Sequence, residues 1–120
     1  MQYLLMIYAN EAEYGKIDPA TLQKVYEEYG TFTQSIVKSG NFKAGDRLQP
    51  TTTATTIRIR DGKTMTTDGP FAETREQLGG YYLIEAANLD DALRIGARIP
   101  SVRMGSIEVR TVVVHAPPKK

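Results

Sequence analysis

The chain has 120 residues and a formal net charge of +1, because fifteen Lys and Arg residues are balanced by fourteen Asp and Glu residues. The basic residues are interleaved with acidic ones, so neither nucleic acid nor a membrane is favoured as a partner. The absence of cysteine excludes disulfides, thiol nucleophiles and Cys-ligated metals, and a lone histidine, His115, excludes a multi-His metal site within one chain. No apolar run reaches the roughly 20 residues that span a bilayer, so we expect a cytoplasmic protein without metal or cofactor.

The N-terminal third predicts a strand followed by a long helix. The nearly continuous apolar run over residues 3–8 is typical of a strand covered on both faces. Residues 9–17 are expected to form a loop. Asp18 and Pro19 then supply an N-cap and a first helical residue, and Gly40 supplies a terminator. The apolar stripe of this helix recurs at three- and four-residue spacing: Leu22, Val25, Tyr26, Tyr29, Phe32, Thr33, Ile36 and Val37.

The middle of the chain predicts an extended segment and a β-hairpin. Residues 41–50 are expected to be extended and to bury Phe42 and Leu48. The threonine-rich run that follows is β-prone. Residues 57–67 then predict a hairpin, because Ile and Arg alternate before Asp61-Gly62, the pair that a type I′ turn prefers.

The C-terminal third predicts two strands around a second helix. Residues 81–87 indicate a strand, and Asn88 is a suitable N-cap for the helix that follows. We expect Asp90 to pair with Arg94 on this helix, because the two are four residues apart. Residues 106–114 alternate and are predicted to be the final strand. The expected buried face of the second helix consists of Leu89, Ala92, Leu93 and Ile95.

The order of these elements predicts an α+β fold of the ferredoxin-like type, the split β-α-β pattern with an added β-hairpin. No linker or repeat interrupts it, so residues 1–115 are expected to form one domain, followed by a flexible C-terminal tail over residues 116–120. If both helices cover one face of the sheet, the other face is partly apolar and needs a cover. A second copy of the chain supplies one, which predicts a homodimer with a barrel-like arrangement.

The most informative segment is 68–82, which combines carboxylates, a guanidinium, an amide and two phenols with glycines and a proline. It joins predicted strands, and loops on such rigid elements tend to carry binding and catalytic residues. Asp68 is a candidate general base, or alternatively a carboxylate that accepts backbone N–H bonds and holds the Gly69-Pro70 turn. Arg75 is either an anchor for an anionic ligand or an ion partner of neighbouring glutamates.

Several segments of the chain resemble the YCII-related family, in the branch named after its Asp-Gly-Pro-Phe motif. The resemblance runs over nearly the whole chain and rests above all on residues 68–71 with the continuation Leu-Gly-Gly-Tyr-Tyr-Leu-Ile-Glu. Residues 3–8, 44–50 and 54–63 carry it as well. The resemblance implies a dimeric α+β barrel of ferredoxin-like subunits, with a pocket in each protomer near the barrel mouth or the interface.

The resemblance leaves the activity open. We expect a pocketed homodimer that binds a small molecule. One alternative is a cofactor-free enzyme for proton transfer or elimination on a small organic substrate, with Asp68 as the base. Another is a regulatory or adaptor module, because some members of this branch are encoded beside extracytoplasmic-function sigma factors. The candidate ligand-binding residues are Tyr8, Asp46, Arg47, Phe71, Glu73, Arg75, Gln77 and Tyr81.

Overall fold

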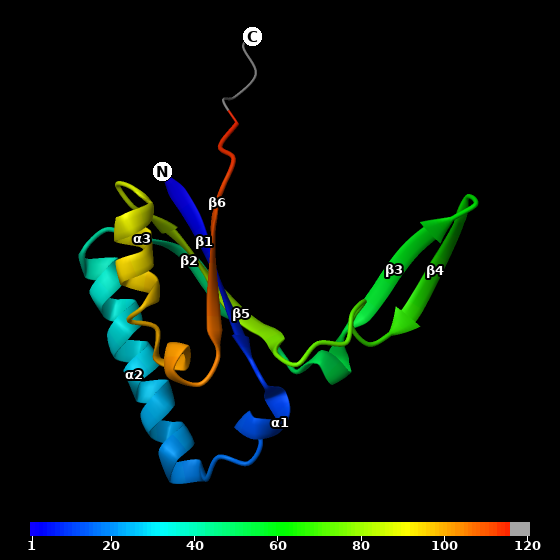
Figure 1. Cartoon of the computed structure of the whole chain (residues 1–120), viewed down its shortest axis with the longest axis horizontal. Coiled ribbons are helices and arrows are strands. Elements are labelled where there is room, and N and C mark those ends of the chain that lie inside the picture. Colours follow the sequence, from blue (N-terminus) through cyan, green and yellow to red (C-terminus); the bar gives the residue numbers. More distant parts are fainter. Residues whose placement is uncertain (116–120) are drawn as a thin grey trace.

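A four-stranded antiparallel sheet lies at the centre of the computed structural model, which describes residues 1–115 (Figure 1). Its strands are β1 (Gln2–Ala9), β2 (Phe42–Arg47), β5 (Gln77–Glu85) and β6 (Ser106–Thr111). Their spatial order, β2-β5-β1-β6, is that of a ferredoxin-like split β-α-β sheet, so the predicted α+β fold class is confirmed. The tail predicted over residues 116–120 lies outside the described residues.

Two capped helices, α2 (Pro19–Lys38) and α3 (Leu89–Gly96), cover one face of this sheet (Figure 1). The Asp18 carboxylate accepts a hydrogen bond at 3.1 Å from the backbone N–H three residues further on, and the Asn88 side chain caps α3 in the same way. Gly40, with φ at 83°, is the left-handed residue that follows α2. The long helix and both predicted caps are therefore confirmed.

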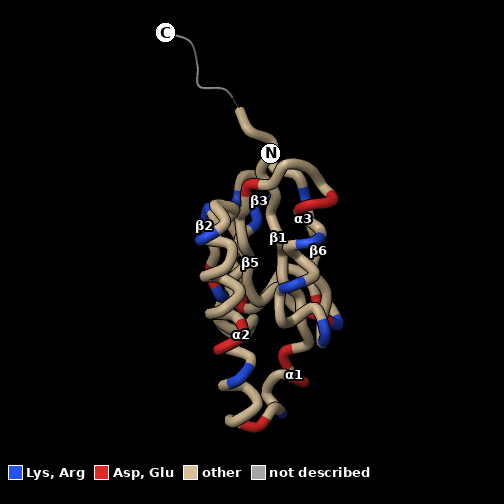
Figure 2. The backbone as a smooth tube through the Cα atoms, turned by 90° about the vertical axis from the view of Figure 1, so that its left-hand side faces the viewer, with Lys and Arg blue, Asp and Glu red and all other residues tan. Residues whose placement is uncertain are grey.

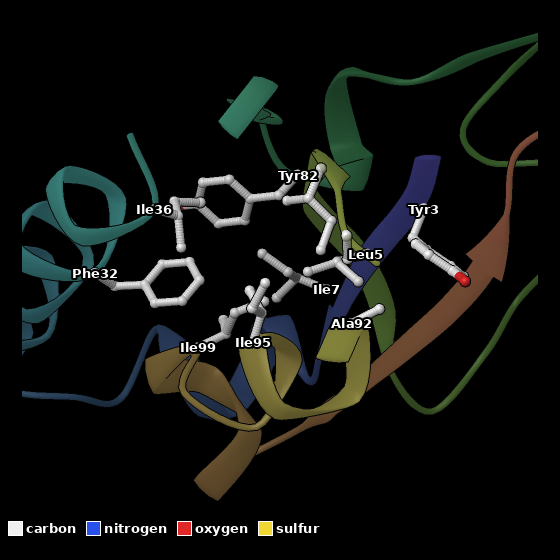
Figure 3. Packing of buried hydrophobic residues seen from close by; sticks show 11 residues of the cluster. Tyr3, Leu5, Ile7, Phe32, Ile36, Tyr82, Ala92, Ile95 and Ile99 are labelled. Carbon is white, nitrogen blue, oxygen red and sulfur yellow. The ribbon is translucent and has the colours of Figure 1, made fainter. Parts of the chain in front are cut away.

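The core forms where alternate residues of β1 and β5 meet the helices (Figure 3). Tyr3, Leu5 and Ile7 of β1 are buried against this layer. The rings of Phe32 in α2 and Tyr82 in β5 pack edge to face, with centroids 5.3 Å apart. Burial of each large aliphatic side chain contributes roughly 1.5–3 kcal/mol, which makes this cluster the main source of stability. Its other members are Ile36, Ile84, Ala86, Ala92, Ile95 and Ile99.

The opposite face of the sheet carries neither α2 nor α3. The intervening residues of β1 and β5 pair across the ladder there, Leu4 with Leu83 and Met6 with Tyr81. Together with Tyr8, these four side chains form a half-buried apolar strip that we call the open face.

A separate two-stranded sheet, made of β3 (Thr55–Arg60) and β4 (Lys63–Asp68), projects away from the four-stranded sheet (Figure 1). Its turn lies at Asp61 and Gly62, whose φ angles are 53° and 75°. Positive φ at both central residues is the mark of a type I′ turn, so the predicted hairpin is confirmed.

Two short helices, α1 and η1, lie in segments for which the sequence predicted a loop and an extended run. The expected loop 9–17 contains α1 (Glu11–Tyr14), because the Asn10 side chain accepts hydrogen bonds from two backbone N–H groups and caps the turn. The β-prone threonine run begins as a 3-10 turn, η1 (Thr51–Thr53), before β3 starts. A second 3-10 turn, η2 (Pro100–Arg103), lies between α3 and β6.

The strand boundaries also differ from those predicted. β5 begins at Gln77 and not at residue 81, because Gly80 and Leu78 still pair with β1. β6 ends at Thr111 and not at residue 114. Thr111 pairs with Tyr3, and β1 begins only one residue earlier, at Gln2.

Several leucines lie outside the core, contrary to prediction. Leu48, Leu89 and Leu93 are 44%, 48% and 47% exposed, because only one narrow side of the short helix α3 contacts the sheet and Leu48 lies just beyond the end of β2. Arg94 pairs with Asp91, three residues earlier, and not with Asp90.

Lys and Arg residues are interleaved with Asp and Glu residues along the backbone (Figure 2). Among residues 1–115, the ion pair between side chains that spans the longest stretch of sequence joins Arg103 of η2 to Glu28 of α2 at 2.7 Å. Both partners are more than 40% exposed, and exposed pairs of this kind contribute little to stability. The fold therefore depends on its apolar core.

Gly105→Ala is expected to lower the free energy of unfolding by about 1–3 kcal/mol, because its added Cβ would lie 2.0 Å from the carbonyl oxygen of Tyr8 and force β1 and β6 apart. The matched control is Gly30→Ala in the interior of α2, where the added Cβ has no neighbour within 4 Å. It should stabilise the protein by roughly 0.5–1 kcal/mol. Urea unfolding of both variants checks the pair, and an unchanged midpoint for Gly105→Ala would contradict the close approach.

Candidate functional site

A cavity of about 760 Å³ lies between α1, the N-terminal half of α2 and the β2–β5 side of the sheet. Its walls are largely apolar, with the rings of Tyr26 and Phe42 and the aliphatic side chains of Ile7 and Leu22 among them. A volume of this size lies within the range of roughly 300–1,000 Å³ that small-molecule sites occupy.

Three hydroxyl groups from three separate elements meet in this cavity. Tyr14 of α1 and Tyr29 of α2 both hydrogen-bond to the hydroxyl of Ser101 in η2, the first at 2.8 Å. Ser101 is only 3% exposed, and it is the polar residue buried most deeply among residues 1–115. We call these three residues the hydroxyl triad.

The number of protons in the hydroxyl triad defines what it offers to a ligand. Each hydroxyl carries one proton and can also accept hydrogen bonds. Two hydrogen bonds join the three oxygens of Tyr14, Ser101 and Tyr29, so they use two of the three protons. One O–H donor and several lone pairs remain, which suits the oxygen of a carbonyl or hydroxyl group.

Burial favours the neutral form of two phenols in the cavity, Tyr29 and Tyr82. Burial raises the pKa of Tyr29 to about 12, although the hydrogen bond with Ser101 acts in the opposite direction. Burial also raises the pKa of Tyr82, whose hydroxyl makes a 2.7 Å hydrogen bond with Thr33. The same cost of desolvation applies to a charged ligand atom placed beside these groups.

The charged side chains around the cavity already have partners. The guanidinium of Arg47 lies over the ring of Tyr26, 4.9 Å from its centroid. The Asp46 carboxylate accepts a 2.8 Å hydrogen bond from Tyr81, and this bond raises the pKa of the Tyr81 phenol. These charges therefore mark the rim of the cavity, while its interior carries hydroxyls.

Glu11 and Gln77 connect the segment that follows β4 to the wall of the cavity. The backbone N–H of Glu11 donates to the side-chain oxygen of Gln77 at 3.0 Å, and the amide nitrogen of Gln77 donates to the carbonyl of Thr74 at 2.6 Å. The carboxylate of Glu11 accepts hydrogen bonds from the backbone N–H and the hydroxyl of Thr51, at 2.8 and 2.7 Å. We call these contacts the Glu11 junction.

The structure separates the residues that the sequence proposed as one site. Asp46, Arg47 and Gln77 line the cavity, and Tyr81 borders it, although Tyr81 alternates with the buried Tyr82 and its side chain belongs to the open face. Phe71, Glu73 and Arg75 are exposed in the segment after β4, and Tyr8 lies on the open face with its hydroxyl 3.9 Å from the sulfur of Met6. Whether any of these residues contacts a ligand stays a prediction.

Asp68 lies at the exposed end of β4 and does not line the cavity. Among residues 1–115, its carboxylate takes no part in a side-chain hydrogen bond that holds the turn. The backbone of Gly69 holds it instead, donating to Ala54 at 2.7 Å and accepting from the hydroxyl of Thr56 at 2.8 Å.

Sequence reasoning missed the hydroxyl triad. Tyr29 was part of the apolar helix stripe, Tyr14 lay in an expected loop, and Ser101 followed a helix without any motif. The N-capping residue Asn10 was a signal for α1, and hence for the placement of Tyr14. No pattern within the chain links Ser101 to two phenols 72 and 87 residues away.

Within the described range, no three His, Cys, Asp or Glu side chains lie close enough together to hold a metal ion. None of the helices described combines the length and the apolar character that crossing a bilayer requires.

Tyr29→Phe is expected to flatten the loss of stability at high pH. The folded pKa is about 12, against about 10 in an unfolded chain, so folding favours the protonated phenol. This contribution is complete below about pH 10 and is lost as the pH rises toward about 12. Urea unfolding across this range should show a steeper fall in the free energy of unfolding for the wild type, and equal slopes would contradict the assignment.

The chain matches the family model described as YCII-related domain over residues 1–115. It is also 35% identical over 119 residues to an uncharacterized protein of Rhizobium meliloti (strain 1021), which covers 98% of this chain and 96% of that protein. The match spans the four-stranded sheet, the helices α2 and α3, and the projecting hairpin. The chain therefore belongs to the YCII-related family.

Proposed function

We propose that this protein binds a small, uncharged ring compound that carries a hydroxyl or carbonyl oxygen, in the cavity between α1, α2 and the β2–β5 side of the sheet. The hydroxyl triad is the observation that carries the proposal. It offers one unused O–H donor beside several acceptor lone pairs at the buried end of a largely apolar cavity.

The electrostatics of the cavity support a neutral ligand. Burial raises the pKa values of Tyr29 and Tyr82, which shows that negative charge is disfavoured at both phenols. A ligand carboxylate placed there would incur the same desolvation cost without a cation to offset it, since Arg47 lies at the rim over Tyr26. A ligand ammonium would likewise have hydroxyls but no carboxylate at the buried end.

The acid–base alternative has less support. Asp68, its candidate base, is exposed at the end of β4 and lies outside the cavity. A general base must come within hydrogen-bond reach of the proton that it removes, directly or through one water. The proposal of a binding function does not require such a base.

Calorimetric titration with benzyl alcohol, benzoate and benzylamine tests the ligand class, because these ring probes differ mainly in the charge of the head group. Benzyl alcohol should bind most tightly. Ser101→Ala should weaken its binding about tenfold, the effect of losing one hydrogen bond of about 1.4 kcal/mol. Tighter binding of benzoate would contradict the proposed class.

Asp68→Asn is the matched control in the same titration. We expect it to bind benzyl alcohol as the wild type does, since Asp68 does not line the cavity. Loss of binding in this variant would instead favour the acid–base alternative.

We propose further that two copies of the chain associate through their open faces. Leu4, Met6 and Leu83 form an apolar strip on the face of the sheet opposite the helices, and they are half-buried in the single chain. Packing two such faces removes this apolar surface from water and gives an isologous dimer, in which the same patch serves both copies.

Light scattering at micromolar concentration should give about twice the chain mass of 13.3 kDa. Leu83→Arg should shift the protein toward the monomer, because it places a charge at the centre of the open face. Leu93→Arg is the matched control, since this leucine is 47% exposed on α3, on the helical side of the sheet. A monomeric wild type, or an equal effect of both substitutions, would refute association through the open face.

A further inference from the structure

The β3–β4 hairpin is left uncovered by the rest of the chain. All residues of β4, and all of β3 except Thr56, are exposed. The radius of gyration is 16.9 Å, whereas a compact chain of this length would have about 14 Å, as expected for a fold with a projecting element. An isolated two-stranded hairpin is marginally stable in water, so this one requires a contact outside its own two strands.

One face of the hairpin is uncharged and β-branched over its two central pairs, with Asp68 opposite Thr55 at its root. Ile57 lies opposite Thr66, and Ile59 lies opposite Thr64, so the four side chains share one face, which we call the isoleucine face. The two isoleucines are 66% and 63% exposed. Two large apolar side chains side by side on an exposed strand are a surface that natural proteins usually cover.

The other face of the hairpin is basic. Arg58 lies opposite Met65, and Arg60 lies opposite Lys63. Among residues 1–115, none of these three cations forms an ion pair. Charged side chains on exposed strands oppose unspecific pairing with other strands, so this face is suited to solvent.

The hairpin stands on the same side of the sheet as the open face. Figure 1 shows α2 and α3 on one side of the four-stranded sheet and the hairpin on the other. A second copy packed on the open face therefore lies beside the hairpin of the first copy. Two-fold symmetry then places each hairpin against the other copy.

The area of the open face points to the same occupant. A sheet of four strands about 4.8 Å apart, with about 3.3 Å per residue along the eight residues of β1, presents roughly 500 Å². A standard interface buries about 800 Å² on each partner. One face of the hairpin adds roughly 200 Å², and symmetry adds the surface that receives the partner's hairpin. The open face alone is smaller than a standard interface, whereas the open face with two hairpins reaches that size.

We propose that the β3–β4 hairpin is a dimerisation arm, whose isoleucine face packs on a second copy of this chain when two copies meet through their open faces. The proposal rests on the homodimer proposed above and adds a second element, the hairpin, to its interface. The basic face of the arm then lies at the solvent-exposed rim of the interface, where polar and charged groups are usual.

The full-length double variant Ile57→Thr/Ile59→Thr tests the arm. Threonine is also β-branched, so the strand and its type I′ turn are retained while the apolar contact is removed. Sedimentation equilibrium should show that the dimer dissociation constant rises at least tenfold. The matched control is Met65→Thr, an apolar-to-threonine change at a 52% exposed residue on the basic face, which should stay within twofold of the wild type.

A measurement on the unmodified protein gives an independent check. Amide hydrogen exchange in β3 and β4 should slow as the protein concentration passes through the dimer dissociation constant. Exchange in these strands that does not depend on concentration would overturn the arm.

The remaining outcomes separate the two proposals. An unchanged dissociation constant for Ile57→Thr/Ile59→Thr overturns the arm and leaves the open-face dimer standing, whereas a monomeric wild type overturns both. If Met65→Thr raises the dimer dissociation constant as much as the double variant does, the assignment of the isoleucine face is overturned. Binding of the wild type to phosphatidylserine vesicles, abolished in the double variant without a change in its dissociation constant, would assign the hairpin to a membrane and overturn the arm. Titration with benzyl alcohol on the same variants reports the cavity separately.

Discussion

Burial of alternate residues of β1 and β5 against α2 and α3 is the interaction on which the rest of the structure depends, because a strand side chain can point to only one of two faces. Tyr3, Leu5 and Ile7 face the helices, so Leu4 and Met6 must lie on the other face. The apolar strip of the open face is therefore a direct consequence of the core. A sheet that places large apolar residues on both faces, with helices on only one, leaves the side chains of its other face half-buried.

The same arrangement positions the cavity. α2 extends beyond the packed centre of the sheet, and the stretch before Phe32 lies over the ends of β2 and β5, where α1 and η2 close the space. Tyr14, Tyr29 and Ser101 therefore meet at the junction of three elements, two of which, α1 and η2, are short. Two hydrogen bonds join their hydroxyls, so only one O–H donor is left unused at the buried end of the cavity, and the cost of placing polar groups there is reduced.

Local signals were enough to predict most of the fold from the sequence. Asp18, Asn88 and the pair Asp61-Gly62 act through backbone contacts a few residues away, and the structure has the two caps and the turn that these residues predict. The errors concern features that depend on contacts distant in sequence, such as the length of β6 and the exposure of Leu48. The site was harder to predict for the same reason, since Ser101 has no neighbour in sequence that identifies its two phenol partners.

The Glu11 junction connects the cavity wall to both ends of the hairpin through hydrogen bonds. Thr51 lies just before β3 and Thr74 lies after β4, so Glu11 and Gln77 hold both roots of the hairpin to α1. The last residue of α1 is Tyr14, a member of the hydroxyl triad. A rotation of the hairpin about its two ends would therefore move the Tyr14 phenol. If the ligand binds more tightly in one orientation of the hairpin, then a contact that holds the hairpin in that orientation is strengthened by the same free energy when the ligand binds.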